Sequence, residues 1–199
     1  MAGAEIKSSR SIRCFVALPL PQVFTAEIIR VQGRIGAFPE IRWIGQANLH
    51  LTTHFLGDVP ENFPELITGV LDAAAAHQVP FKLKLAALGC FPNLENARVL
   101  WAGLEGEVPQ LVLWQKTLET SLQSFDYQKE NREFRPHITF GRTRRGLSAA
   151  AQKKIQTVLL SDIPHQIFDR AVLFQSRLTP QGPHYEVLHE TAFCRSAAA

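Results

Sequence analysis

The sequence predicts an α+β protein of two similarly built lobes, with mainly antiparallel sheets flanked by helices and a cleft between the lobes. Three observations lead to this prediction. Segments with the period of a strand and segments with the period of a helix follow one another in mixed order. Several strand-to-strand connections are too short for the crossover that parallel strands need. A short motif, His-x-Thr, occurs at His50 and again at His137, 87 residues later, in similar strand-like surroundings.

The first part of the chain predicts a strand, a helix and the first motif strand. Residues 1–10 are polar, and we expect a flexible N-terminus there. A strand over residues 12–18 ends at a proline pair, and Pro21 suits the first position of the helix that follows. Residues 41–44 are an extended piece that leads into the strand of His50. The turn residues 57–60 are expected to end that strand.

The middle of the chain predicts two helices and two further strands. Apolar residues recur at helical spacing over residues 64–77 and again over 109–124. Residues 81–85 alternate with period two, which is typical of a half-buried strand. Residues 89–96 are expected to be a loop, followed by a strand over 98–104.

The last third contains the second motif strand between basic residues. A basic loop over residues 128–135 precedes His137, and a helix over 148–160 follows, with Ser148 as its N-cap. Two closing strands are predicted over 167–176 and 185–191. We expect residues 11–195 to form a single two-lobed domain and 196–199 to be a disordered tail.

Composition excludes several classes of protein. The 199 residues are 46% hydrophobic and 20% charged, as in an ordinary soluble protein, and the net charge of +3 is too weak to indicate nucleic acid by itself. The apolar run over residues 14–20 is too short to span a bilayer, and Met1–Arg10 lacks the apolar centre of a signal peptide. Three distant cysteines favour no disulfide framework. We therefore expect a cytoplasmic monomer without a membrane segment.

The two motifs predict phosphodiester chemistry. In a strand, residues i and i+2 share a face, so each His and its Thr point the same way, roughly 7 Å apart. Two such strands side by side would place two imidazoles and two hydroxyls around one cleft. One imidazole can take a proton from an attacking oxygen and the other can protonate the leaving oxygen, while the hydroxyls donate to phosphate oxygens. This scheme needs neither a metal nor a cofactor.

The sequence resembles the two-histidine (2H) phosphoesterases, and specifically the RNA 2′,3′-cyclic phosphodiesterases once called 2′-5′ RNA ligases. The resemblance runs from about Arg13 to Glu190. Its carriers are Arg13-Cys-Phe-Val-Ala-Leu-Pro, Arg42-Trp43, Asn48-Leu-His-Leu-Thr-Thr-His-Phe-Leu-Gly57, Leu88-Gly-Cys-Phe-Pro92, Arg98-Val-Leu-Trp-Ala-Gly103, Arg135-Pro-His-Ile-Thr-Phe-Gly-Arg142 and the loop from Ser176 to Tyr185.

The resemblance implies a bilobal fold with pseudo-two-fold symmetry and hydrolysis of a terminal RNA 2′,3′-cyclic phosphate to a 2′-phosphate. His50 and His137 would be the acid and base, and the family's pattern favours His50 as the acid. Thr52, Thr139 and Arg142 would bind the phosphate. The partner would be RNA with a cyclic phosphate end, tRNA fragments included. Some members also join RNA ends through a 2′-5′ linkage, which is the same step run backward.

Four further residues are candidate RNA contacts. The family more often has Leu and then Lys or Arg where this chain has Thr53 and His54, and in a regular strand His54 would share the face of His50. Arg135 lies in the basic segment before the second motif. Tyr185 lies in a loop that the family places near the cleft, and Phe91 could stack on a base. The spacing of His50 and His54 would suggest zinc on a helix, but in this strand context we expect no metal.

Two other functions are consistent with the same residues. A relative with the same chemistry could act on a small cyclic nucleotide or on ADP-ribose 1″,2″-cyclic phosphate. A protein of another class could bind RNA ends without turnover. That reading would require a broken motif, and both motifs are complete.

Overall fold

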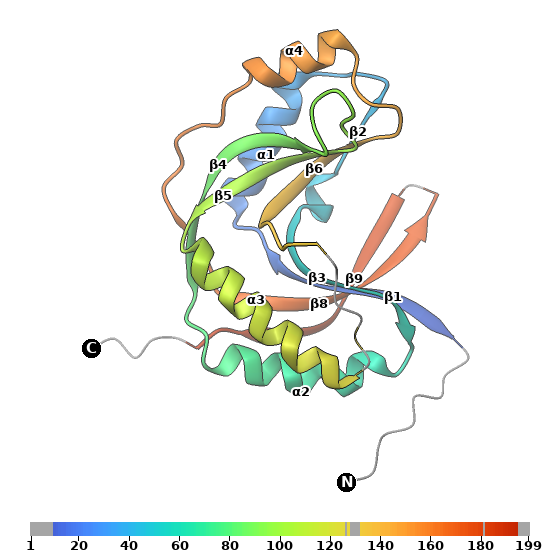
Figure 1. Cartoon of the computed structure of the whole chain (residues 1–199), viewed down its shortest axis with the longest axis vertical. Coiled ribbons are helices and arrows are strands. Elements are labelled where there is room, and N and C mark those ends of the chain that lie inside the picture. The colour runs from blue at the N-terminus through green and yellow to red at the C-terminus, as the bar shows by residue number, and fades with distance from the viewer. Residues whose placement is uncertain (1–9, 126, 128–131, 181, 195–199) are drawn as a thin grey trace.

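The fold is built on two antiparallel sheets (Figure 1). The computed structural model describes residues 10–125, 127, 132–180 and 182–194. The first sheet has the order β3 (His50–Pro60), β1 (Ser11–Pro19), β8 (Arg170–Thr179) and β9 (Gly182–Ala192). The second has the order β2 (Ile41–Trp43), β6 (His137–Thr143), β5 (Val99–Gly106), β4 (Phe81–Phe91) and β7 (Gln166–Phe168). All the pairings are antiparallel, so the predicted α+β class is confirmed.

Each sheet takes strands from both ends of the chain. The first sheet places the early strands β1 and β3 beside the late strands β8 and β9. The second sheet begins with β2, which the chain reaches between β1 and β3. Consequently the two sheets are not two consecutive halves of the sequence, and each is completed by a segment distant along the chain.

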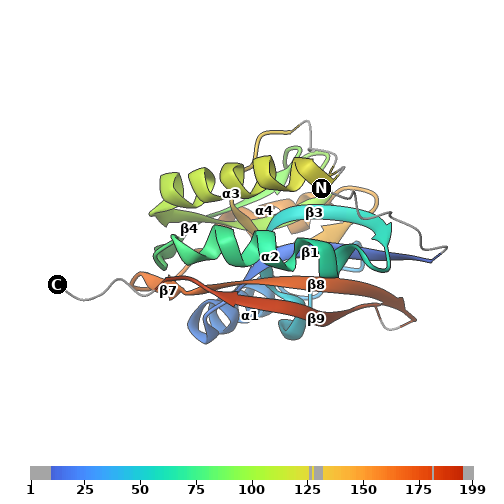
Figure 2. The ribbon, with the colours of Figure 1, turned by 90° about the horizontal axis from the view of Figure 1, so that it is seen from below.

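The described residues form four α-helices that flank the sheets, as Figures 1 and 2 show from two sides. They are α1 (Gln22–Ile35), α2 (Phe63–Ala76), α3 (Val108–Leu122) and α4 (Ala149–Thr157), and two short 3₁₀ turns span Gln46–Asn48 and Gln123–Phe125. Helix α2 packs on β8 and β9, and α3 contacts α2, β3 and β4. Helix α1 packs against the second sheet, where the Gln32 amide donates to the Phe140 carbonyl at 2.9 Å.

The sequence periodicity located the helices well. The four predicted helices agree with the observed ones to within a few residues. Ser148 caps α4 as predicted, because its hydroxyl accepts from the Ala151 amide at 3.3 Å. Pro21 is the N-cap residue of α1 rather than its first helical residue.

Several predicted strand bounds are wrong. The strand predicted over residues 167–176 is divided between β7 and β8, which lie in different sheets, and the closing strands β8 and β9 extend into the predicted loop between them. Strand β3 continues through residues 57–60 to Pro60, and Gly57 has a φ of 75° that favours glycine at a bulge. Strand β4 continues to Phe91 through the segment predicted as a loop. There Gly89 lies beneath the Trp101 ring, and a Cβ at that position would be 2.3 Å from a ring carbon. Only glycine allows the indole to lie flat on the strand.

The predicted flexible N-terminus and disordered tail fall largely outside the described residues, as does part of the basic loop over 128–135. The assignment of residues 11–195 to a single domain stays a prediction.

Candidate functional site

The first His-x-Thr motif opens β3. His50 is the first residue of that strand and pairs with Pro19 of β1. Its Nδ1 lies 2.8 Å from the carbonyl oxygen of Asn48. Because a carbonyl only accepts, the neutral ring carries its proton on Nδ1, and Nε2 is left as an acceptor. The backbone two residues upstream thus fixes the tautomer of the ring.

The second motif repeats this arrangement at the start of β6. The Nδ1 of His137 donates to the carbonyl oxygen of Arg135 at 2.7 Å, again two residues upstream. The Arg135 guanidinium itself is exposed and lies 3.4 Å from Glu133. The structure therefore shows a main-chain role for Arg135 at this site, whereas a side-chain contact with RNA stays a prediction.

The two motif strands meet although they belong to different sheets. β3 and β6 are in contact, and His137 is close enough that a proton on its ring opposes protonation of His50 and lowers the pKa of His50. Thr52 and Thr139 follow their histidines by two residues and are half-buried. In the described part of the chain, neither threonine hydroxyl forms a hydrogen bond with another residue. Two imidazoles and two available hydroxyls are thus brought to one place.

A β-bulge in β6 turns Arg142 onto the face of this motif. Thr139 pairs with Trp101, and Arg142 pairs with Val99, while Gly141 pairs with the intervening Leu100. Trp101 and Val99 point to the same side of β5, so Thr139 and Arg142 also share a side. Without the extra residue Phe140, Gly141 would occupy that place. The positive charge of Arg142 acts on both His50 and His137.

A bulge at the matching position of β3 turns His54 the other way, so the prediction that His54 shares a face with His50 is wrong. Thr52 pairs with Ala17 and His54 with Val16, and adjacent residues of β1 point to opposite sides. The His54 ring is 2% exposed and donates from Nε2 to the Gln115 carbonyl of α3 at 3.0 Å. His54 is a hydrogen-bonded core residue, and a contact with RNA is excluded by its burial.

Both motif histidines have lowered pKa values. Burial lowers the pKa of His50 to about 4, opposed by its bond to Asn48 and reinforced by Arg142 and His137. Burial and the charge of Arg142 also lower the pKa of His137, against its bond to Arg135. Both rings are therefore neutral at pH 7 before a ligand binds, and a bound phosphate anion would favour protonation of the ring beside it.

Aromatic side chains surround each imidazole. The His50 ring centroid lies 4.8 Å from that of Phe15 and 5.2 Å from that of Tyr185. The His137 ring lies 5.1 Å from Phe91, edge to face. The structure thus places the predicted residues Tyr185 and Phe91 at the site, one beside each histidine. Burial raises the pKa of the Tyr185 hydroxyl, while Arg142 lowers it.

An open pocket of about 420 Å³ lies beside His50. Its walls come from the start of α1, the 3₁₀ turn before β3, and the strands β8 and β9. It is lined by Pro19, Leu20, Gln22, Thr25, Gln46, Ala47, Leu49, His50, Phe174 and Tyr185. Aromatic rings and amide side chains together suit a planar polar group such as a nucleobase.

Two aromatic residues of the site, Phe15 and Phe174, were not predicted from the sequence. Phe15 stacks on Phe174 with centroids 5.2 Å apart, and both rings lie near His50. Both occur in apolar strand segments, where a phenylalanine is ordinarily a core residue. Only the pairing of β1 with β8 brings them together, and no local pattern predicts that pairing.

The described residues offer no cluster of three or more His, Cys, Asp or Glu side chains that could hold a metal ion. In the same part of the chain, no helix has both the length and the apolar character needed to cross a membrane.

Comparison with known proteins agrees with this geometry. The sequence pattern of the LigT-like phosphoesterase family matches residues 18–101 and again residues 103–185. The RNA 2′,3′-cyclic phosphodiesterase of Methanocaldococcus jannaschii is 33% identical over 181 residues, which are 90% of this chain and 99% of that protein. The RNA 2′,3′-cyclic phosphodiesterase of Methanothermobacter thermautotrophicus is 28% identical over 179 residues, which are 87% of this chain and 95% of that protein.

Solved structures give the same result. TT0787 of Thermus thermophilus superposes with a TM-score of 0.76 at 27% identity, covering 93% of this chain and all of the other. Escherichia coli LigT in its apo form superposes with a TM-score of 0.72 at 26% identity, covering 94% of this chain and all of the other. With one motif strand in each matched segment, the chain belongs to the LigT-like phosphoesterase family of the 2H superfamily.

Proposed function

We propose that this protein hydrolyses the 2′,3′-cyclic phosphate at the end of an RNA chain to a 2′-phosphate. The observation that carries the proposal is the pair of histidines, each held through Nδ1 by the carbonyl two residues upstream, with Arg142 acting on both. The curated relatives carry the name of this activity. The chemistry needs one group that accepts a proton and one that donates a proton at the same phosphorus.

In the proposed reaction, a water molecule attacks phosphorus while the base, His137 at Nε2, takes its proton. The bond between phosphorus and the 3′ oxygen breaks, and His50 donates its Nε2 proton to that oxygen. Thr52 and Thr139 donate to the non-bridging oxygens, and Arg142 stabilises the negative charge that grows on them. His50 receives its acidic proton only with the substrate, because its pKa of about 4 leaves it neutral in the free protein.

The pocket beside His50 would hold a nucleoside attached to the reacting phosphate. Joining a 5′ hydroxyl to the cyclic phosphate would use the same groups in reverse, and we include 2′-5′ ligation in the proposal as the back reaction. A cytoplasmic location and a monomeric state stay predictions.

The test is incubation of the purified protein with a short RNA ending in a 2′,3′-cyclic phosphate, in EDTA. Products with a 2′-phosphate and with a 3′-phosphate are resolved by chromatography. We expect the 2′-phosphate alone. A 3′-phosphate product would contradict the assignment of the leaving oxygen, and activity lost on adding EDTA would contradict the metal-free scheme. Turnover of a small cyclic phosphate but not of RNA would favour a phosphodiesterase for cyclic nucleotides or ADP-ribose 1″,2″-cyclic phosphate. Tight binding of RNA ends without turnover would favour a protein that only binds RNA ends.

A further inference from the structure

A second arginine lies directly opposite Arg142 in the sheet. Strand β2 pairs with β6 so that Arg42 is the cross-strand partner of Arg142. Residues paired in this way point to the same side, with Cα atoms roughly 5 Å apart. Both arginines are exposed. Like charges directly opposite each other destabilise a strand pair, so the fold alone gives no reason for this pair.

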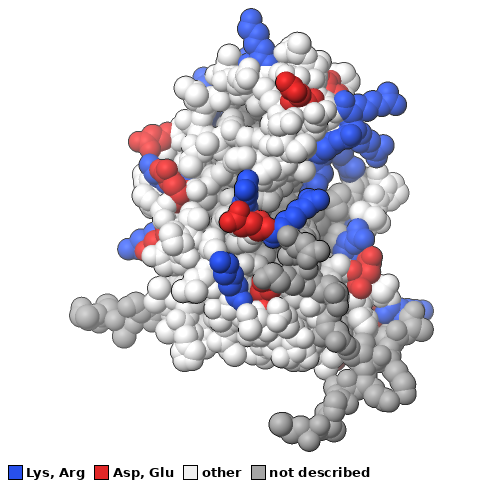
Figure 3. All heavy atoms as spheres, in the orientation of Figure 1, with Lys and Arg blue, Asp and Glu red and all other residues white. Residues whose placement is uncertain are grey.

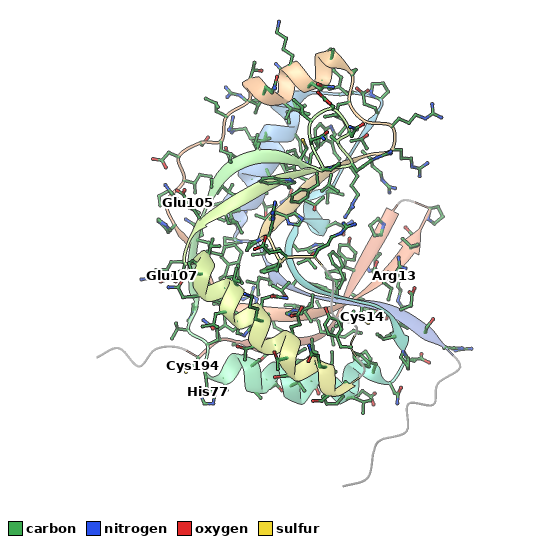
Figure 4. All side chains as sticks on the ribbon, viewed as in Figure 1. Arg13, Cys14, His77, Glu105, Glu107 and Cys194 are labelled. Carbon is green, nitrogen blue, oxygen red and sulfur yellow. The ribbon has the colours of Figure 1, made fainter. Side chains whose placement is uncertain are left out.

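Several exposed arginines elsewhere in the molecule have acidic partners. Arg13 (labelled in Figure 4) lies 3.0 Å from Asp58, and Arg177 lies 2.9 Å from Glu186. Arg170 lies 3.6 Å from Glu190. In contrast, no carboxylate among the described residues forms a salt bridge with Arg42 or Arg142.

The surroundings of this pair are also basic. Arg144 and Arg145 follow β6 and are exposed, and neither forms a salt bridge within the described part of the chain. Figure 3 shows basic side chains gathered beside the segment that joins β6 to α4. The carboxylate of Glu40 lies at the end of this segment and accepts from the amide and hydroxyl of Ser148, whereas Glu105 and Glu107 lie on the other side of the molecule, near the start of α3 (Figure 4). The region therefore favours an anion with more than one charge.

The two paired arginines differ in their relation to the reacting groups, because Arg142 lies on the same strand as His137 and Arg42 lies on the neighbouring edge strand β2. Arg142 lowers the pKa of His50, His137 and Tyr185, whereas Arg42 is not among the causes of any of these shifts. The Arg42 guanidinium instead lies against Gly182 at the start of β9, where an added Cβ would be 2.7 Å from Nη2. Arg42 thus reaches from the second sheet to the β8–β9 hairpin of the first, next to Arg142 and farther from the histidines.

We infer that Arg42 binds the phosphodiester that precedes the terminal nucleotide of the substrate, so that the protein selects RNA chains over mononucleotides. The inference rests on the proposed function, in which Arg142 contacts the cyclic phosphate itself. An arginine fork holds a phosphate through two charge-assisted hydrogen bonds. The next phosphate of the chain supplies the negative charge that the exposed pair lacks, and it also offsets the repulsion between the two arginines.

The test combines a protein variant with a substrate variant. Two dinucleotides ending in a 2′,3′-cyclic phosphate are compared, one with an ordinary internal phosphodiester and one with an uncharged methylphosphonate. For the wild-type protein we expect the methylphosphonate to lower kcat/KM about tenfold, since a phosphate contact of this kind contributes about 1.4 kcal/mol. For Arg42→Gln we expect kcat/KM to be equally low on both substrates. Arg42→Lys keeps the charge but loses the two parallel hydrogen bonds of the guanidinium. Its ratio of kcat/KM on the two dinucleotides should fall between the ratios of the wild type and of Arg42→Gln.

Arg170→Gln is the matched control, because Arg170 is an exposed arginine at the start of β8, far along the strand from the β8–β9 hairpin that Arg42 contacts. It should show the same tenfold methylphosphonate effect as the wild type. An Arg42→Gln protein that still distinguishes the two dinucleotides tenfold would overturn the inference, as would a wild type that does not distinguish them. A purely structural contact with Gly182 would lower kcat/KM on both substrates by the same factor, which is also a negative result. Failure of the proposed function is distinguishable, because the wild type would then turn over neither dinucleotide.

Discussion

The two motif strands, β3 and β6, are alike in the arrangement of their first four residues and differ immediately afterwards. Each begins with a histidine held by the carbonyl two residues upstream. Each continues with a threonine and then a bulge at the following residue, Thr53 or Phe140. The fifth residue after the histidine returns to the motif face in both copies. It is Phe55 in β3 and Arg142 in β6.

This difference makes the two copies chemically unequal. Phe55 is 50% exposed and carries no charge, whereas Arg142 acts on both histidines. The residue before it is the buried His54 in β3 and Gly141 in β6, where an added Cβ would be 3.0 Å from the Trp43 ring. His50 also has the more strongly aromatic surroundings. The shared motif thus supplies two histidines held in the same way, and in the proposed mechanism the neighbouring residues give them different roles.

The largest effect should come from removing either histidine, because the proposed reaction uses one as the acid and the other as the base. We expect His50→Ala and His137→Ala each to lower kcat on a cyclic-phosphate RNA about 10³-fold, the usual contribution of a general acid or base. Single-turnover kinetics measures the loss, and circular dichroism should show an unchanged fold. A variant that keeps more than a tenth of the activity would mean that only one copy performs proton transfer.

A substrate with a good leaving group should separate the two copies. A nitrophenyl phosphodiester needs no acid because its leaving oxygen departs as an anion. If His50 is the acid, His50→Ala should lower kcat on this ester less than tenfold, whereas His137→Ala should still lower kcat about 10³-fold. The rates are followed by nitrophenolate absorbance. The opposite pattern would make His137 the acid and reverse the direction expected from the family.

The next largest loss of activity is expected at the fifth residue after the histidine, which is Arg142 in β6 and Phe55 in β3. Arg142→Gln should lower kcat/KM about 10²-fold, because a positioned cation at the phosphate is lost. It should also raise the pKa of His50 and of His137, because Arg142 lowers both. The pKa values are measured by NMR titration of the imidazole protons. The matched variant Phe55→Ala should change activity less than threefold, and a larger loss would mean that the two positions are not as different as the structure indicates.

The smallest effect on activity is expected at His54, whose counterpart in β6 is Gly141 and not a second histidine. His54→Gln keeps a donor toward the Gln115 carbonyl, so kcat at pH 7 should change less than threefold. The stability should respond to pH instead. The pKa of His54 is lowered to about 4 in the folded protein, mainly by burial, against about 6.5 when unfolded.

The sign of this effect follows from proton binding. Between pH 6.5 and 4 the unfolded chain binds a proton at His54 that the folded protein does not, so stability is complete above about 6.5 and is lost as the pH falls toward 4. His54→Gln should remove roughly 3 kcal/mol of that loss in the free energy of unfolding. Urea unfolding at several pH values measures it. Parallel pH curves for the two proteins would contradict this, because they would show that folding does not lower the pKa of His54.

Much of the architecture was determined by local sequence pattern. Apolar periodicity located α2 and α3, and the Ser148 cap located the start of α4, because these signals lie within one or two turns of helix. The repeated His-x-Thr located both candidate catalytic strands for the same reason: a residue and its neighbour two positions later share a face in any strand. Tyr185 was found through the resemblance and Phe91 through the aromatic stacking that RNA ends favour, and the ring of each contacts one of the histidines.

Tertiary structure alone decided which residues after the motif face the site. A bulge is defined by the partner strand, so the sequence of β3 does not show that Thr53 is the extra residue and that His54 turns into the core. The same holds for the bulge at Phe140 that brings Arg142 to the histidines. The meeting of Phe15 with Phe174, and of Arg42 with Arg142, also depends on pairing between segments that are far apart along the chain. Side-chain periodicity is a property of one segment, whereas register and contact are properties of two.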